Sequence, residues 1–550
     1  MKKLTASLPI ITIFLIGVVL RFYRLDSNPP APTWDEVAWG YNAFSLLLTG
    51  RDEFGRLLPF DYLESFGDFK PPVYAYLSII PVALFGLNEF SARFASAFFG
   101  SITVVITYFL VKSIFSSSSR KESYALLSAL FLALSPWHIN LSRAAFEANI
   151  ASFFLITGIW LFVSGVRNNK WFLSLSVISF VLSMYTFNTS RIVAPLLGLM
   201  LVVVFFRDLR KFWRKSLVAL SIGCIMFFPL LPFLLSPNAQ LRFEEVNIFS
   251  DPGPVITANE HIANNNNAWW SQILDNRRVF YAREYVKHYF DNLDPSFLFV
   301  KGDGNPKFST HVVGQMYLFD LPFFVIGLLF LFRKREGRWY LLPLWLIIGI
   351  IPAATARETP HALRIETILP VPQILVAYGV SQVIVGMTMI KSLRMRHIKN
   401  AALSVGALFL VLNVSYYLHD YYTHYPKSFS GEWQYGYADA FLYTESKKGE
   451  YDKVLFTMDL GRPYAYYLFY SKMPPGDFLK DSKIKRDNFG FVSVERVGKY
   501  YFQRDLPIST PPGEKILYVN TPQKVPGNAV ILKKFLQLNG EPSLVAYWMH

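Results

Sequence analysis

Residues 73–87 of the chain read VYAYLSIIPVALFGL, and the placement of this run decides the fold. The run is apolar enough for a membrane helix, but it is short, contains Pro81 and follows the pair Pro71-Pro72. A helix needs about 20 apolar residues to cross the hydrocarbon core of a bilayer. The run is therefore ambiguous by itself, and the remainder of the chain must show whether it spans the membrane.

The composition makes lipid the main solvent of this chain. Of its 550 residues, 52% are hydrophobic and 17% are charged, and the mean hydropathy is +0.28. Soluble domains carry roughly 25% charged residues. We expect a polytopic α-helical membrane protein with about 11 transmembrane helices. The apolar runs that predict them are 6–22, 94–111, 123–137, 149–165, 171–186, 192–206, 216–235, 317–332, 339–355, 366–390 and 400–418.

The basic residues resolve the ambiguity of residues 73–87, because loops rich in Lys and Arg stay on the cytoplasmic side. If 73–87 does not span, every basic loop falls on the side of Lys2-Lys3. If it spans, all loops from residue 112 onward face outward. We therefore expect 73–87 to form a short interfacial or re-entrant helix on the outer side. The basic loops are 112–121, 167–170, 207–215, 333–335 and 391–399.

This topology predicts a multi-pass protein of the plasma (inner) membrane with a cytoplasmic N-terminus. The transmembrane domain covers residues 1–419, and its outer loops are 23–93, 138–148, 236–316 and 356–365. Residues 420–550 alternate helix-like stretches with short β-like runs, at 453–457, 515–519 and 529–532. We expect them to form a small extracytoplasmic mixed α/β domain. The net charge of +15 belongs to the cytoplasmic loops and does not indicate nucleic-acid binding, which needs a basic soluble face.

Two adjacent carboxylates, Asp35 and Glu36, lie just past the first span among aromatic and apolar residues. A partly desolvated setting can raise the pKa of a carboxylate and suit it to act as a base. The alternative is structural: Thr33, Asp35 or Glu36 could cap the helix that runs to Leu48.

Lys70 precedes the stiff turn Pro71-Pro72 at the start of the interfacial helix. An ammonium held at the level of the lipid headgroups is well placed to bind a phosphate. The alternative is ordinary snorkelling of the lysine toward the headgroups.

Residues 357–364 place two arginines and a histidine, His361, in one short outer loop. An anionic ligand would explain them, because the arginine fork matches phosphate. The alternative for Arg364 and its neighbour Arg357 is an internal ion pair with Glu358 or Glu366.

Arg143 and Glu147 lie four residues apart in the second outer loop, so they share a helix face and can pair. Glu147 could instead contribute to a divalent metal site, with His138 and Asn149 as neighbours and His311 as a more distant candidate ligand. The spacing is not specific for a metal.

Taken together, these segments resemble the GT-C superfamily of integral membrane glycosyltransferases. The protein O-mannosyltransferase and aminoarabinose transferase branch (glycosyltransferase family 39-like) is the most similar. The resemblance covers residues 1 to about 420 and rests on the order of five motifs. They are Trp34-Asp35-Glu36, Lys70-Pro71-Pro72-Val73-Tyr74, Ala92-Arg93-Phe94, Ser142-Arg143 and His361-Ala362-Leu363-Arg364.

The resemblance implies transfer of a sugar from a polyprenyl-phosphate donor to an acceptor hydroxyl on the outer face of the membrane. It implies that Asp35, with Glu36 beside it, is catalytic and that Asp35 is the base. A single displacement by the acceptor inverts the anomeric centre. The residues that it implies for substrate and phosphate binding are Lys70, Arg143, His361, Arg364, Tyr41 and Asp68.

Some relatives in this superfamily bind a divalent metal, and the mannosyltransferase branch does not need one. Here Phe69 occupies the position before the lysine where the aminoarabinose branch has a glutamate. A metal therefore remains an open alternative, with Glu147 and His311 as candidate ligands and no certain cofactor.

Two other classes of function are alternatives to an enzyme. A transporter or flippase of a lipid-linked glycan should carry charged residues inside its spans and inverted repeats, whereas the spans here are nearly free of charge. A non-catalytic assembly protein of the cell envelope would leave Asp35, Lys70 and Arg364 unexplained. The expected partners are the donor, an acceptor hydroxyl and membrane lipids, without nucleic acid.

Overall fold

The computed structural model describes residues 2–239, 247–388, 393–486 and 492–549. Parts of four predicted segments lie outside the described residues: the outer loop 236–316, the span 366–390, the basic loop 391–399 and the domain 420–550. The chain forms two compact units. Unit 1 comprises Met1–Leu20, Gly100–Asn140 and Ala148–Tyr417, and unit 2 comprises Arg21–Phe99, Leu141–Glu147 and Leu418–His550.

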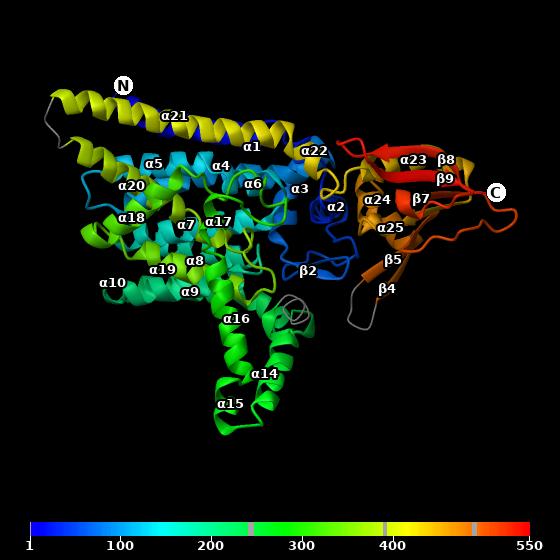
Figure 1. Ribbon diagram of the computed structural model, residues 1–550, viewed down its shortest axis with the longest axis horizontal. Helices are drawn as coiled ribbons and strands as arrows, with labels where there is room; N and C mark the ends of the chain where they lie inside the picture. Colours follow the sequence, from blue (N-terminus) through cyan, green and yellow to red (C-terminus); the bar gives the residue numbers. More distant parts are fainter. Residues whose placement is uncertain (1, 240–246, 389–392, 487–491, 550) are drawn as a thin grey trace. The chain divides into compact units, whose positions relative to one another are not determined.

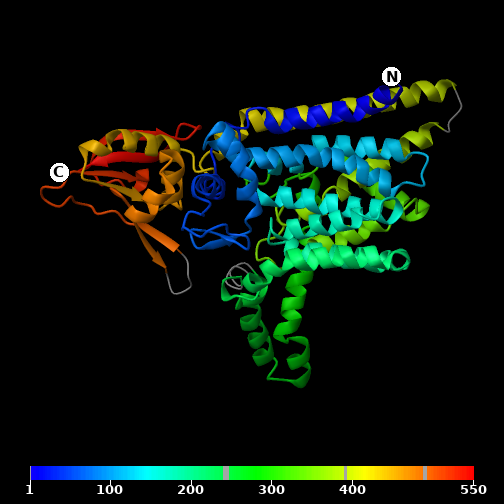
Figure 2. The ribbon, with the colours of Figure 1, turned by 180° about the vertical axis from the view of Figure 1, so that it is seen from behind.

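Unit 1 is a bundle of helices, which is the form that lets apolar segments satisfy their backbone hydrogen bonds internally. In both views α1 runs alongside α21, and α14 to α16 form an arm that extends from the other helices (Figures 1 and 2). The helices lying wholly or mostly in this unit are α1 (Lys2–Phe22), α4 (Glu89–Ile114), α5 (Lys121–Leu134), α6 (Pro136–Arg143), α7 (Glu147–Arg167), α8 (Phe172–Met184), α9 (Ser190–Val204), α10 (Phe206–Lys211), α11 (Trp213–Phe227), α12 (Leu231–Leu234), α14 (Gly253–Asn264), α15 (Trp269–Leu274), α16 (Arg277–Asp291), α17 (Pro295–Phe299), α18 (Asp320–Lys334), α19 (Leu341–Ile350), α20 (Val371–Thr388) and α21 (Leu393–Thr423).

Four of the described helices are long and apolar enough to cross a membrane: Glu89–Ile114, Glu147–Arg167, Trp213–Leu234 and His397–Thr423. A fifth results if α5 and α6, which are bent by 55° at their junction, count as one span. Shorter apolar stretches of helix lie at Leu8–Phe22, Val73–Phe85, Phe172–Met184, Ser190–Val204, Leu341–Thr355 and Val371–Met387 in the described part of the chain. The predicted number of 11 spans is therefore not confirmed, because several apolar runs are broken into short helices.

Residues 73–87 form the helix α3 (Val73–Phe85), which has 13 residues. At 1.5 Å per residue such a helix is about 20 Å long, short of the roughly 30 Å hydrocarbon core. Its exposed apolar side chains include Ile80 and Leu84. The helix itself was predicted, and its placement on the outer side of the membrane stays a prediction.

Unit 2 combines the segment after α1 with the C-terminal part of the chain. Its C-terminal part contains a seven-stranded sheet with the strand order β4-β5-β6-β3-β7-β9-β8. The central strand β3 runs parallel to β6 and β7, and the outer pairs are antiparallel. The strands are β3 (Lys453–Thr457), β4 (Ser482–Arg486), β5 (Val492–Val497), β6 (Tyr500–Gln503), β7 (Ile516–Asn520), β8 (Val530–Leu536) and β9 (Pro542–Trp548). The runs predicted at 453–457, 515–519 and 529–532 are thus β3, β7 and β8.

The helices of unit 2 join the predicted first outer loop to the sheet in one hydrophobic core. Val37, Ala38 and Tyr41 from α2 are buried in the same cluster as Phe441 and Phe456. The sequence reasoning separated these segments into two domains. The helices of this unit are α2 (Trp34–Thr49), α3 (Val73–Phe85), α22 (Tyr425–Phe429), α23 (Tyr437–Lys447), α24 (Pro463–Ser471) and α25 (Pro475–Asp481).

A two-residue turn carries Lys70 back toward α2. The strands β1 (Leu63–Ser65) and β2 (Asp68–Lys70) pair in antiparallel register. The turn residues Phe66 and Gly67 have φ angles of +47° and +81°. Such hairpin turns need positive φ at both positions, which glycine adopts freely and phenylalanine does not. Phe66 holds this conformation because it is buried and its N–H donates to the Tyr464 hydroxyl at 2.9 Å.

Candidate active site

The start of α2 is held by a capping box. The Thr33 hydroxyl accepts a hydrogen bond from the Glu36 N–H at 3.3 Å, and the Glu36 carboxylate accepts one from the Thr33 N–H at 2.8 Å. Thr33 and Glu36 therefore cap the helix, which is the structural alternative considered for this motif. Asp35 lies between them in the first turn, and its side chain is left available for other contacts.

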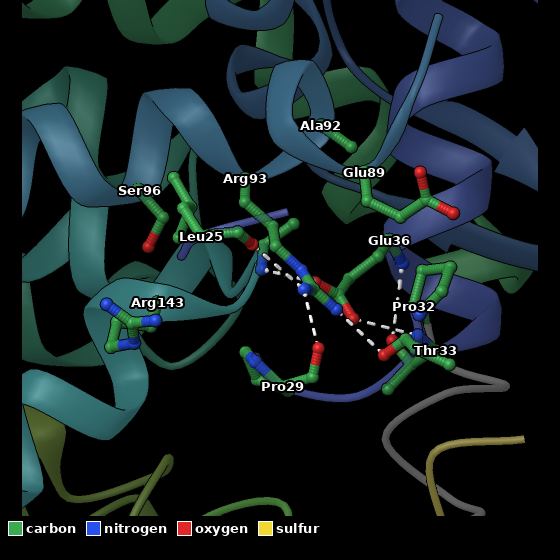
Figure 3. A network of polar contacts seen from close by, with 12 residues as sticks. Leu25, Pro29, Pro32, Thr33, Glu36, Glu89, Ala92, Arg93, Ser96 and Arg143 are labelled. Atoms are coloured by element: carbon green, nitrogen blue, oxygen red, sulfur yellow. Dashed lines mark hydrogen bonds and ion pairs between the residues drawn. The ribbon is translucent and has the colours of Figure 1, made fainter. Parts of the chain in front are cut away.

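The buried guanidinium of Arg93 binds Glu36 (Figure 3). Its Nε donates to the Glu36 carboxylate at 2.8 Å, and both side chains have 0% exposure. Its other nitrogens donate at 2.7–3.0 Å to three backbone carbonyls, those of Leu25, Pro29 and Ala31. A buried ion pair needs such additional hydrogen bonds to offset the loss of hydration. Glu36 thus fixes the loop that leads into α2.

Arg143 is buried in a second network around the same loop. Its guanidinium donates to the carbonyls of Tyr23 at 2.7 Å and Asn28 at 2.8 Å, and to the Tyr421 hydroxyl at 3.2 Å. It also lies 5.4 Å and 5.3 Å from the ring centres of Tyr421 and Tyr422. These contacts hold residues 23–28, and the side chain has no exposed surface to offer a phosphate.

Asp35 forms an ion pair with Lys70, which arrives from the end of β2. The Lys70 side chain is 6% exposed and that of Asp35 is 40% exposed. The Lys70 ammonium also lies 5.0 Å from the Trp39 ring centre and 4.5 Å from the Phe66 ring centre. The aromatic faces stabilise this desolvated cation. The carboxylate can therefore reach the solvent while the ammonium behind it is held in place.

Asp68 and Glu147 complete this cluster of charges. The charges of Asp35, Lys70 and Asp68 all act on the carboxyl group of Glu147. Unit 2 therefore brings together four predicted site residues from three distant segments. Neighbouring carboxylates favour the protonated form of a carboxyl group and an ammonium favours the ionised form.

Tyr41 does not point into this cluster. Its side chain is 1% exposed, and its hydroxyl donates to the Met473 carbonyl at 3.0 Å. Tyr41 thus lies in the hydrophobic core of unit 2, although the resemblance implied substrate binding.

His361, Arg364 and His311 lie in unit 1. The backbone N–H of His361 donates to the side-chain oxygen of Asn292 at 3.1 Å. The centre of the His361 imidazole lies 5.0 Å from the ring centre of Phe308. Burial and, to a smaller extent, the charge of Arg364 together lower the pKa of His361 to about 3. The imidazole is therefore neutral at neutral pH and does not add a positive charge.

Asp303 positions the loop that carries His361 and Arg364. Its carboxylate accepts hydrogen bonds from the backbone N–H groups of Ala362 at 2.6 Å and Asn305 at 2.8 Å. Burial raises the pKa of Asp303 to about 6 against the effect of these bonds. Asp303 and Ala362 are 59 residues apart, so only the fold reveals this contact.

The two candidate metal ligands lie in different units, Glu147 in unit 2 and exposed His311 in unit 1. Among the residues that the structure describes, no group of three or more His, Cys, Asp and Glu side chains is arranged to hold a metal ion. The geometry offers no support for assigning particular ligands.

Glu53, which sequence reasoning did not single out, is a buried acid near Lys70. It is 1% exposed, and burial raises its pKa from 4.5 to about 8. The nearby charges of Asp52 and Glu64 raise it as well, whereas Ser65 and Lys70 lower it. The group is therefore largely protonated in the folded protein at neutral pH.

The titration of Glu53 should make stability fall as the pH rises from about 5 to 8. Over this window the folded state keeps a proton that the unfolded state releases, so each increase in pH favours unfolding. The Glu53→Gln variant has no titrating group at this position, so it should lack this loss of stability. Between pH 5 and pH 8, its midpoint of thermal unfolding should fall less than that of the unsubstituted protein, by on the order of a few degrees.

Thermal unfolding of the purified protein in detergent at pH 5, 6.5 and 8 measures this effect. The exposed Glu432 provides the control, and Glu432→Gln should keep the pH dependence of the unsubstituted protein. An unchanged pH dependence in Glu53→Gln would show that Glu53 is not the titrating group.

Residues 69–235 match the family model described as dolichyl-phosphate-mannose-protein mannosyltransferase. An uncharacterized protein of Aquifex aeolicus (strain VF5) is 31% identical over 181 residues, which cover 32% of this chain and 34% of that protein. The match thus spans about a third of the length of that relative.

Two solved structures are similar to the chain over nearly its whole length. ArnT from Cupriavidus metallidurans in the apo state has a TM-score of 0.54 and 12% identity, and the match covers 99% of this chain and 98% of that one. The same protein bound to undecaprenyl phosphate has a TM-score of 0.53 and 12% identity, with 98% of each chain covered. At such low identity the likeness shows a shared fold.

Proposed function

We propose that this chain, which belongs by its fold to the GT-C superfamily of membrane glycosyltransferases, transfers a sugar from a polyprenyl-phosphate donor to an acceptor hydroxyl. The ion pair between half-exposed Asp35 and buried Lys70 carries the proposal. It supplies a carboxylate for the acceptor and a cation for the donor phosphate, side by side.

The family match and the fold support the class of donor. The matched family is described by a dolichyl-phosphate sugar, and one structure with this fold holds undecaprenyl phosphate. Both are phosphates of long isoprenoid alcohols. A donor of this class fits Lys70, which comes three residues before the apolar helix α3.

The reaction needs one base and one stabilised leaving group. Asp35 accepts the proton of the acceptor hydroxyl as its oxygen bonds to the anomeric carbon. The bond from that carbon to the phosphate oxygen breaks, and polyprenyl phosphate leaves with the electron pair. A single displacement of this kind inverts the anomeric centre. Lys70 binds the donor phosphate from its place beside Asp35 and so stabilises the leaving group.

Glu36 and Arg143 act as positioning residues in this proposal. Glu36 is bound by Arg93 and by its own capping box, and Arg143 holds the loop before α2. Neither side chain is free to exchange protons with a substrate. Arg364 remains a proposed second cation for the donor, and its approach to Asp35 stays a prediction.

We also propose the topology in which the basic loops face the cytoplasm. The N-terminus then lies on the cytoplasmic side of the plasma membrane, and the C-terminal sheet domain lies outside. Transfer occurs on the outer face, where the donor has already been flipped.

Release of polyprenyl phosphate from a panel of polyprenyl-phosphate sugars tests this function in the purified protein in nanodiscs. The unsubstituted protein should release it in the presence of an envelope extract that supplies acceptors. Lys70→Gln should lower kcat/KM by roughly 10²–10³-fold, because a preorganised charge at the leaving group is lost. Lys480→Gln, at an exposed lysine of α25, is the matched control and should keep the activity.

Two outcomes would contradict the proposal. If no donor of the panel is cleaved, or if intact donor crosses the bilayer without cleavage, the protein is not a transferase of this kind. If Lys70→Gln turns over as fast as the Lys480→Gln control, Lys70 does not bind the leaving phosphate.

A further inference from the structure

A cavity of about 320 Å³ lies in unit 1 among the ends of α4 and α7 and the beginnings of α5 and α8. The helices around it are tied together by direct contacts. The hydroxyls of Ser113 in α4 and Ser164 in α7 lie 3.3 Å apart, and the Ser176 hydroxyl of α8 donates to the Gly158 carbonyl of α7 at 2.7 Å. Figure 1 shows these helices in the same bundle. The cavity is thus part of the fold and is not formed by a surface loop.

The lining of this cavity carries an excess of positive charge. Lys112, Lys121 and Arg167 all contribute to it. Lys112 is paired with Glu122 at 2.8 Å. No ion pair of the described residues includes Lys121 or Arg167. The Lys121 ammonium donates to the Ser116 carbonyl at 3.5 Å, and it interacts electrostatically with Glu122. The residues that line the cavity thus include three cations and no carboxylate.

Arg338 adds a further charge beside the cavity. Its guanidinium donates to the carbonyl of Ser113, a lining residue, at 3.5 Å. Burial lowers the pKa of Arg338, and the like charge of Arg167 lowers it as well, whereas Tyr340 and the charge of Asp208 raise it. Cations that repel one another in a partly buried place are stabilised when an anion binds between them.

Aromatic side chains form the other wall of the cavity. Phe109 and Trp160 stack with their ring centres 5.6 Å apart, and Phe172 lines the cavity beside them. Phe109 remains 41% exposed. Such rings gather at the level where lipid headgroups meet the acyl chains. The cavity lies at the ends of two candidate spans, Glu89–Ile114 and Glu147–Arg167. The ends of a membrane-spanning helix meet the headgroup region.

We propose that this cavity binds the phosphate-bearing headgroup of an anionic membrane lipid. Lys121 and Arg167 bind the phosphate, and the aromatic wall contacts the glycerol and the upper acyl chains. Basic pockets between membrane helices on the cytoplasmic side are suited to anionic headgroups. A free phosphate ion also carries negative charge, but it has no apolar part that could contact the aromatic wall. The site contains none of the proposed catalytic residues, and it is independent of the sugar transfer.

Native mass spectrometry of the full-length protein in detergent tests the site with phosphatidylglycerol, phosphatidylcholine and inorganic phosphate as separate probes. The double variant Lys121→Gln/Arg167→Gln should bind phosphatidylglycerol roughly 10–30-fold more weakly than the unsubstituted protein. The matched control is Arg207→Gln/Arg210→Gln, which removes the same charge from exposed positions in α10 and should change binding less than twofold.

Three results would overturn the proposal: equal binding to both double variants, equal binding of phosphatidylcholine and phosphatidylglycerol, or full displacement of the lipid by millimolar phosphate. A second experiment uses the unsubstituted protein, so it stands even if the double variant fails to fold. A phosphatidylglycerol analogue with a photoreactive headgroup should label peptides that contain residues 109–121 and 160–172. Labelling confined to other peptides would place the lipid elsewhere.

Discussion

Replacing Asp35 by asparagine should lower the rate of sugar transfer by roughly 10²–10⁴-fold, because the variant has no group to accept the proton of the acceptor hydroxyl. The side chain keeps its shape and can still meet Lys70. Asp35 is 40% exposed and is not part of the capping box, which Thr33 and Glu36 form. The loss should therefore appear in kcat, with little change in the midpoint of thermal unfolding.

The measurement is the initial rate of polyprenyl phosphate release at saturating donor, with thermal unfolding recorded on the same samples. Asp26→Asn changes an exposed aspartate in the same segment before α2 and should retain the full rate. A rate of Asp35→Asn within threefold of the unsubstituted protein would remove Asp35 as the base. It would leave the assignment of the donor untouched.

Replacing Arg93 by methionine should destabilise the protein by about 3–5 kcal/mol, since it leaves the Glu36 carboxylate buried without its cation. Three backbone carbonyls lose their donor at the same time. The midpoint of thermal unfolding should fall by on the order of 10 °C. Activity should fall with it, because the network fixes the loop before Asp35.

A double variant separates the effect of the stranded carboxylate charge from the effect of the lost packing. Arg93→Met/Glu36→Gln removes the stranded carboxylate and should recover part of the lost stability. Lys524→Met is the matched control, because Lys524 pairs with Asp459 at 2.9 Å on the surface and such pairs contribute less than about 1 kcal/mol. Equal shifts for Arg93→Met and Lys524→Met would show that the buried pair does not stabilise the fold.

Local rules were enough to predict several elements from the sequence. A helix start with Thr33 among its possible caps was one alternative for the acidic pair, and the helix at residues 73–85 follows from one apolar run. The strand at 453–457 follows from its β-branched and apolar residues. Each of these signals lies within a few neighbouring residues, so no knowledge of the fold was needed.

The contacts that define the site could not be predicted in this way. Glu36 and Arg93 are 57 residues apart, and nothing near Glu36 indicates which cation it meets. A basic residue inside the apolar start of α4 was the available signal for Arg93, because a charge there needs a partner. Lys70 could be matched to Asp35 only through the resemblance to a family.

The predicted number of spans is not confirmed, for a related reason. Hydropathy counts apolar residues, and it does not show where a run breaks. The junction of α5 and α6 at Ser135 bends by 55° and shortens the predicted span 123–137. Burial inside the protein also makes helices apolar without requiring them to cross the bilayer.

The hydrophobic core that α2 shares with the C-terminal sheet sets the order in which the protein can mature. The Phe66 N–H donates to the Tyr464 hydroxyl, and this tyrosine is synthesised 398 residues later. A ribosome that adds about 5–20 residues per second reaches that tyrosine roughly 20–80 s after the loop is made. Asp35 and Lys70 are therefore synthesised early, but the hydrophobic core around them can form only after the C-terminal residues have been added. A nascent chain cut short before residue 437 carries the charged pair without the core that supports it, so the proposed site is complete only when synthesis is nearly finished.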